Sequence, residues 1–220
     1  MNRSLAEIVR EYGPFPGIER VHGVTYDGRH VWFAAGESLN ALDPQSGALL
    51  RSIEVAARAG TAFDGRHLFQ LADGRIQKID PKTGRVLATI PAPGGGGDSG
   101  LAWAEGTLWV GQYRARKIHQ VDPETGQILR TIESNRFVTG VTWVDGELWH
   151  GVWDGDEAEL RRIDARTGEV IETLEMPSGI GVSGLESDGR DQFFCGGGGS
   201  GKVRVVRRSR RAVVRSGVGG

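Results

Sequence analysis

The sequence predicts an all-β protein that folds as a single five-bladed β-propeller, with four antiparallel strands in each blade. Two motifs recur along its 220 residues. The first is a glycine followed three residues later by an aromatic residue and a turn, and it begins at Gly23, Gly60, Gly100 and Gly140. The second is a strand that runs into a turn, as in LDPQSG, IDPKTG, VDPETG and IDARTG. Spacings of 37 to 44 residues, with four short strands per unit, are typical of propeller blades.

Each unit is expected to contain four strands, A to D, counted outward from the central channel. Strand A follows the recurring glycine, and a fifth copy at Gly184 lacks only the aromatic residue. Strand B is expected at residues 30–35, 67–72, 107–112, 147–152 and 192–197. Strand C is expected at residues 38–43, 75–80, 117–122, 160–164 and 202–207. Strand D is expected at residues 48–53, 85–90, 127–132 and 169–174. These segments alternate apolar and polar residues, and Asp-Gly or Glu-Gly pairs between A and B favour tight hairpin turns.

Only four strands D follow the second motif, so the fifth has to come from elsewhere. Ser4 to Tyr12 matches the strand D pattern, and we expect it to close the last blade and leave only short protected edges. The alternative is a helix over Leu5 to Tyr12. Residues 1–206 are therefore predicted to form the propeller, and the basic, glycine-ending residues 207–220 a disordered tail.

Composition narrows the functional classes. The net charge of −1 gives no bulk attraction to nucleic acid or to a membrane surface. The N-terminal residues contain no apolar h-region, so we expect no secretory leader. No run reaches about 18 apolar residues, and the single cysteine, Cys195, cannot form an internal disulfide. We expect a cytoplasmic monomer with a small-molecule or peptide substrate, and neither nucleic acid nor a membrane as a partner.

The two faces of the predicted ring differ in sequence. The A–B and C–D turns, on what we call the turn face, are uniform and indicate structure. The D–A and B–C loops, on the loop face, vary between blades, and variation on a repeated scaffold is where function is usually found. Aromatic residues and arginines gather in these loops and suit a polar or anionic substrate. The substrate-binding candidates are Gln70, Gln112, Tyr113, Arg114, Arg116, Arg136, Trp153 and Asp154. The alternative is that the loop arginines only pair with neighbouring acids.

Comparison of the blades at equivalent positions gives the catalytic candidates. The strand B position after the aromatic column holds Phe33, Gln70, Val110, His150 and Cys195. The position before the strand A glycine includes His22, and the position two residues after it reads Thr25, Ala62, Ala102, Thr142 and Glu186. Polar residues that break a repeat need a local reason. His22, His150, Glu186 and Cys195 could supply a nucleophile–base set or a proton shuttle. The alternative is that these side chains bind channel water.

The motifs give no support for a bound cofactor. No HxH, HExxH or CxxC spacing is present, so a zinc site is not predicted. No glycine-rich nucleotide motif links a strand to a helix. We predict no cofactor, although a divalent metal held by channel carboxylates stays open as an alternative.

The repeat units, above all GVTWVDGELWHGVWDGDEAELRRIDARTGEVIETLEMP, resemble those of propeller-type glutamine cyclotransferases. More loosely, they resemble virginiamycin B lyase and lactonase-like propellers. The resemblance implies a propeller fold and a reaction in which an α-amine attacks a glutamine side-chain amide and ammonia leaves. It carries over no catalytic residue, because no catalytic motif of that family can be matched here.

We therefore expect a small cofactor-independent enzyme that uses general acid/base chemistry, of the cyclotransferase kind, on a small polar or anionic substrate at the loop face. One alternative is a propeller that binds a small ligand or a protein without catalysis. A second alternative is a lyase or a lactonase-like hydrolase.

Overall fold

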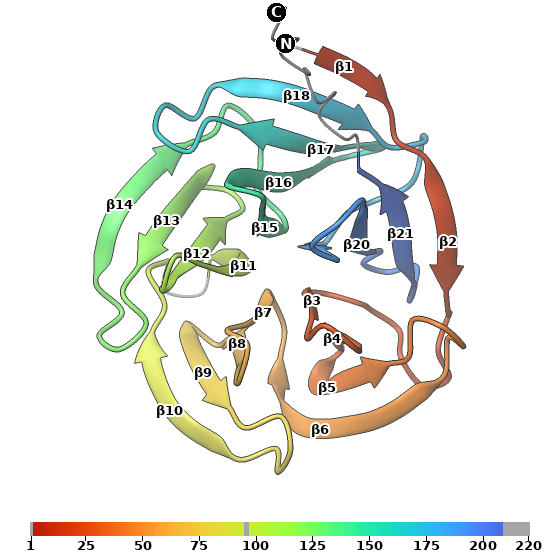
Figure 1. Ribbon diagram of the computed structural model, residues 1–220, viewed down its shortest axis with the longest axis vertical. Coiled ribbons are helices and arrows are strands. Elements are labelled where there is room, and N and C mark those ends of the chain that lie inside the picture. The colour runs from red at the N-terminus through yellow and green to blue at the C-terminus, as the bar shows by residue number, and fades with distance from the viewer. Residues whose placement is uncertain (1, 95–96, 209–220) are drawn as a thin grey trace, which may run out of the picture.

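The structure is a ring of five β-sheets around a central axis (Figure 1), as the repeat predicts. It is a computed structural model, and it describes residues 2–94 and 97–208. No helix occurs in these ranges, and so none that is long and apolar enough to cross a membrane. Leu5 to Tyr12 is accordingly not helical.

The blades follow the predicted order of strands from the axis outward. Blade 1 contains β3 (Val24–Tyr26), β4 (Val31–Ala34), β5 (Gly36–Leu42) and β6 (Leu49–Ala57). Blade 2 contains β7 (Thr61–Phe63), β8 (Leu68–Ala72), β9 (Arg75–Ile79) and β10 (Val86–Pro91). Blade 3 contains β11 (Asp98–Ala104), β12 (Thr107–Gln112), β13 (Lys117–Val121) and β14 (Ile128–Glu133). Blade 4 contains β15 (Val141–Val144), β16 (Glu147–Asp154), β17 (Glu157–Ile163) and β18 (Val170–Glu175). Blade 5 contains β19 (Gly184–Ser187), β20 (Gln192–Gly196), β21 (Val203–Arg207) and β2 (Ile8–Tyr12).

The ring closes through the N-terminal segment, which serves two blades rather than one. β2 pairs antiparallel with β21 and supplies the predicted outer strand of blade 5. The sequence did not predict β1 (Asn2–Leu5), which pairs parallel with β18 as a fifth strand of blade 4. Figure 1 shows the segment passing from the edge of one blade to the edge of the next. The predicted single strand over Ser4 to Tyr12 is therefore divided at Ala6 and Glu7.

The predicted tail begins two residues too early. Arg207 is the last residue of β21. The buried side chain of Arg208 donates to Asp145 Oδ2 at 2.7 Å and to Glu147 Oε2 at 3.1 Å. The rest of the predicted tail, residues 209–220, lies outside the described residues.

The apolar core is divided into five clusters, one between each pair of neighbouring blades. An aromatic residue of strand B in one blade packs on an aromatic residue of the next. Trp109 stacks on Trp143 with ring centroids 5.1 Å apart, and Phe69 stacks on Trp103 at 5.5 Å. Blade 5 lacks the aromatic residue of strand A, and there Trp149 packs on Phe193 of β20 instead. Aromatic pairs of this kind add about 0.5–1.5 kcal/mol to the burial of their area.

The five recurring glycines form a closed ring of backbone contacts at the axis. A Cβ added to Gly23, Gly60, Gly100 or Gly140 would lie within 3.0 Å of the innermost segment of the following blade. A Cβ on Gly184 would meet His22 and Val24 of blade 1, which completes the circle. Side chains are therefore excluded at this level, and the innermost strands converge there.

Replacement of Gly140 by Ala should lower the free energy of unfolding by about 2–3 kcal/mol, since the new methyl group would overlap the backbone of Leu185. Urea unfolding followed by tryptophan fluorescence measures this change. The control is Gly199→Ala, where no atom lies within 4 Å of the added Cβ, and it should change stability by less than about 0.5 kcal/mol. Equal effects at both positions would contradict the glycine ring.

Candidate functional site

The carboxyl group of Glu186 is the group in the structure best suited to transfer protons. It accepts hydrogen bonds from Thr25 Oγ1 at 2.8 Å and from Thr142 Oγ1 at 2.5 Å. The backbone N–H of Ser187 donates to the same carboxyl at 2.8 Å. The two threonines are fully buried and belong to blades 1 and 4, the neighbours of blade 5 on either side. Three consecutive blades therefore fix one side chain.

Burial raises the pKa of Glu186 to about 7, and the hydrogen bonds from Thr142, Thr25 and Ser187 oppose this rise. The residue as a whole is half-buried. A carboxyl group that is half-ionised near neutral pH can both accept and donate a proton.

Glu186 lies on the turn side of the glycine ring. Strand A of blade 5 runs from the loop face toward the turn face, and Glu186 comes two residues after Gly184. Its partners Thr25 and Thr142 come two residues after Gly23 and Gly140. The converging backbones therefore separate this carboxyl from the loop face, where the sequence led us to expect the substrate pocket.

The other three catalytic candidates do not join Glu186. Complete burial lowers the pKa of His150 to about 4, and its Nδ1 lies 3.1 Å from Gly151 O. Burial raises the pKa of the Cys195 thiol to about 12, so the group stays protonated and inaccessible. Burial, with a smaller effect of Arg20, lowers the pKa of the half-buried His22. Within the described ranges, no hydrogen bond or ion pair joins any two of the four candidates.

Gln70 is explained by local packing. It is fully buried in β8, where Thr61 Oγ1 donates to its Oε1 at 2.6 Å. Its Nε2 donates to Ala59 O and Leu71 O at 3.2 and 2.8 Å. All of these partners belong to blade 2, so the side chain holds its own blade together.

Three substrate-binding candidates do lie together at the loop face. Gln112, Tyr113 and Arg114 line a pocket of about 430 Å³ with Asp98. Gln112 is held in place by Asp98, whose Oδ1 lies 3.3 Å from its Nε2. Arg114 is exposed and has no ion-pair partner in the part of the chain that the structure describes. This pocket therefore offers one guanidinium without an ion-pair partner among the described residues.

The remaining loop-face candidates pack against one another. Tyr113 donates to Trp153 O at 3.0 Å, and its ring stacks on Phe137 at 4.6 Å. The guanidinium of Arg116 lies 5.0 Å from the centre of the same Phe137 ring. Gly181 approaches the Trp153 ring so closely that a Cβ there would overlap it. These contacts hold Tyr113, Arg116 and Trp153 in place.

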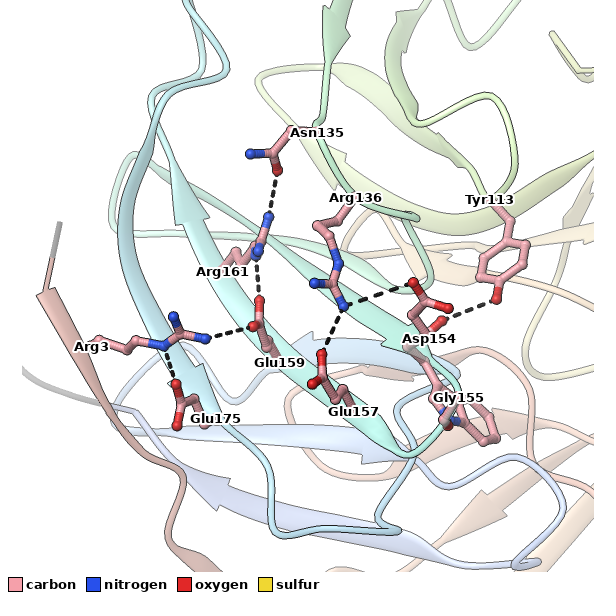
Figure 2. A network of polar contacts seen from close by, with 11 residues as sticks. Arg3, Tyr113, Asn135, Arg136, Asp154, Gly155, Glu157, Glu159, Arg161 and Glu175 are labelled. Carbon is pink, nitrogen blue, oxygen red and sulfur yellow. Dashed lines mark hydrogen bonds and ion pairs between the residues drawn. The ribbon is translucent and has the colours of Figure 1, made fainter.

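Acidic neighbours neutralise Arg136, which forms ion pairs with Glu157 at 3.2 Å and Asp154 at 3.9 Å (Figure 2). The pairing of loop arginines with nearby acids, which the sequence left open as an alternative, holds for this residue.

Next to Arg136 and its two acidic partners, a chain of charged and polar side chains crosses blade 4 (Figure 2). Arg3 of β1 pairs with Glu175 and donates to Glu159 at 3.1 Å. Arg161 then bridges Glu159 and Asn135, at 2.6 and 2.7 Å. The network holds β1 against blade 4. The arginine at its centre, Arg161, is already paired within the network and is not available to bind an anion.

The sequence missed the two threonines that hold Glu186. The blade comparison places Thr25, Thr142 and Glu186 in one column, and this was the available signal. In the described residues, no three His, Cys, Asp or Glu side chains are placed to hold a metal ion.

A family model described as outer membrane protein assembly factor BamB matches residues 72–211. Among solved structures, the glutaminyl cyclase of Myxococcus xanthus superposes with a TM-score of 0.78 at 17% identity, covering 94% of this chain and 97% of that one. The hydrazine synthase of Kuenenia stuttgartiensis gives a TM-score of 0.52 at 17% identity, covering 81% and 56%. No curated protein matches the sequence. At these identities the structural likeness shows the propeller fold alone.

The pH dependence of stability should report on Glu186. Its folded-state pKa of about 7 lies above the ordinary value of 4.5, so the folded state binds more protons between these pH values. The contribution of Glu186 to the free energy of unfolding is therefore present at low pH and is lost as the pH rises from 4.5 to 7. Urea unfolding at pH 5 and pH 8 should show that Glu186→Gln removes about 1–2 kcal/mol of this decline. The exposed control Glu169→Gln should leave the decline as in the wild type, and an unchanged decline in Glu186→Gln would refute the assignment.

Proposed function

The chain belongs to the propeller family described as outer membrane protein assembly factor BamB, and we propose that it is a small enzyme that works by general acid/base catalysis through Glu186. The observation that carries the proposal is a half-buried glutamate whose pKa is raised to about 7 and whose carboxyl group is held in position by Thr25 and Thr142. Enzymes commonly place such groups where a proton has to move in both directions.

The reaction class that best suits one such carboxyl is rearrangement of an amide, as in the glutaminyl cyclase whose fold is similar. An α-amine would attack the side-chain carbonyl carbon of an N-terminal glutamine. The new C–N bond would close a lactam, and the old C–N bond would break to release ammonia. Ionised Glu186 would take the proton from the attacking nitrogen and return it to the leaving nitrogen, so that the carboxylate is regenerated.

The threonines would act as positioning residues in this scheme. Their hydroxyl groups donate to the ionised carboxyl and stabilise that form against the burial that favours the neutral one. The closed blade seams around Thr25 and Thr142 would hold the carboxyl in one orientation, which is the protein's contribution to an acid/base step.

A second candidate function is non-catalytic binding, and the family description supports it. The matching model is described as an assembly factor, which indicates a propeller that displays a face to another protein. For this chain the loop-face pocket beside Arg114 would then be the contact region.

Release of ammonia from peptides with N-terminal glutamine tests the first proposal. The wild type should release ammonia, with kcat/KM changing near pH 7, and Glu186→Gln should lower kcat by about 10²-fold or more. Cys195→Ala is the matched control, because it alters a buried residue of the same blade and should keep the wild-type rate. Equal rates for Glu186→Gln and wild type would refute the role of Glu186, and no ammonia from any such peptide would favour the binding function.

A further inference from the structure

A large groove lies on the turn face, between blades 5 and 1, where the uniform turns predict structure rather than a site. It has a volume of about 770 Å³ and is lined by residues that include Arg10, Gln45, Arg190, Gln192, Phe194 and Val205. We call it the seam groove. We propose that the seam groove binds a small carboxylate that carries a short apolar chain.

The groove exists because one position in blade 5 departs from the repeat. Val205 pairs in register with Phe194, whereas the equivalent strand C positions beside an aromatic residue hold Lys78, Gln120 and Arg162. Lys78 Nζ lies 5.7 Å from the centre of the Phe69 ring, so its long side chain covers that ring. Val205 is shorter than these three residues and does not extend over the Phe194 ring toward the groove as Lys78 extends over Phe69. Blade 1 has Ala41 at this position, but there the neighbouring ring is the larger Trp32.

The rim of the groove has more hydrogen-bond donors than acceptors. Arg10 donates to Pro44 O at 2.9 Å and to Gln45 O at 2.7 Å, and its guanidinium lies 4.8 Å from the centre of the Tyr12 ring. These partners are neutral, so the positive charge of Arg10 is not cancelled. Unused N–H groups of a guanidinium favour an oxyanion.

The opposite rim adds further donors. The side chains of Arg190 and Gln192, and the amide of Gln45 across the groove, form no hydrogen bond with any residue that the structure describes. Asp188 is the acid of the lining, and its Oδ1 already accepts from the backbone N–H groups of Arg190 and Gln192 at 2.8 and 3.1 Å. The excess of donors indicates a ligand that supplies acceptors, and a cation would be disfavoured.

The apolar part of the groove floor comes from Val9, which is 37% exposed, and from the half-buried Tyr26. Phe194 and Val205 are almost completely buried, and Tyr26 packs on Phe194 with ring centroids 5.3 Å apart. A ligand that lies along this floor would bury its own apolar part while its carboxylate reaches the arginines. A bare inorganic anion would leave the exposed apolar surface of Val9 and Tyr26 uncovered. This is why the proposal specifies a short apolar chain.

The groove does not depend on catalysis by Glu186, so binding and turnover are tested separately. Hexanoate is the probe, hexylamine is its cationic counterpart, and binding is followed by calorimetry and by NMR shifts of the Tyr26 and Phe194 rings. Hexanoate should bind and hexylamine should not. Arg190→Gln or Arg10→Gln should weaken binding by about tenfold, because each removes a charged donor. Arg51→Gln, at the blade 1 position equivalent to Arg10, should leave binding unchanged.

The sharpest variant is Val205→Lys, which introduces the residue that blade 2 uses at this position. The new side chain should lie over Phe194 as Lys78 lies over Phe69, and it should abolish hexanoate binding. If that variant does not fold, the Arg190→Gln and Arg10→Gln variants decide the question. No binding of hexanoate, equal binding of hexylamine, or wild-type binding by folded Val205→Lys or by both arginine variants would overturn the proposal.

Discussion

The contact on which the rest of the structure depends is the closure of five glycines around the axis. Each recurring glycine lets the innermost strand of one blade approach the backbone of the next, and the last returns to the first. Because no side chain fits at this level, the blades can converge, and in the described residues strand B aromatic residues form ring pairs across four of the five seams. The glycine that recurs in the sequence thus reflects a steric requirement at the axis of the ring.

The same closure separates the loop side of the molecule from the turn side. On the loop side, Arg136 is paired with acids, Trp153 is packed on glycine backbone, and one pocket beside Arg114 stays open. On the turn side lie Glu186 and the seam groove, in a region that the uniform turns had marked as structural. A face with uniform turns can therefore still carry a candidate site, because the residues that matter chemically belong to the strands and not to the turns.

Much of the fold could be predicted, because every blade repeats the same local rules and the missing fifth strand D has one obvious source. β1 could not be predicted, since a parallel fifth strand breaks the repeat and depends on Arg3 meeting Glu159 and Glu175 across the fold.

The candidate site was predictable only in part. Glu186 stood out as a polar residue in a column of small ones, but its partners Thr25 and Thr142 are 161 and 44 positions away in sequence. His150 and Cys195 stood out in the same way, and burial in a seam separates them from solvent. Comparison of equivalent positions in the five blades finds the polar residues that break the repeat. Only the packing of the folded chain shows which of these residues face water.

The way in which β2 completes blade 5 also constrains how the molecule is made. Glu11 of β2 bonds to Arg204 of β21 across 193 positions, so β2 leaves the ribosome well before the strand with which it pairs. Blades 1 to 3 contain all four of their strands in consecutive sequence and can form during synthesis, whereas blade 5 and the full edge of blade 4 cannot. Throughout translation the unpaired β2 is an exposed strand edge, which is the kind of surface that other chains can join. β2, the strand that closes the finished ring, is therefore also the strand most open to mispairing while the chain is being synthesised.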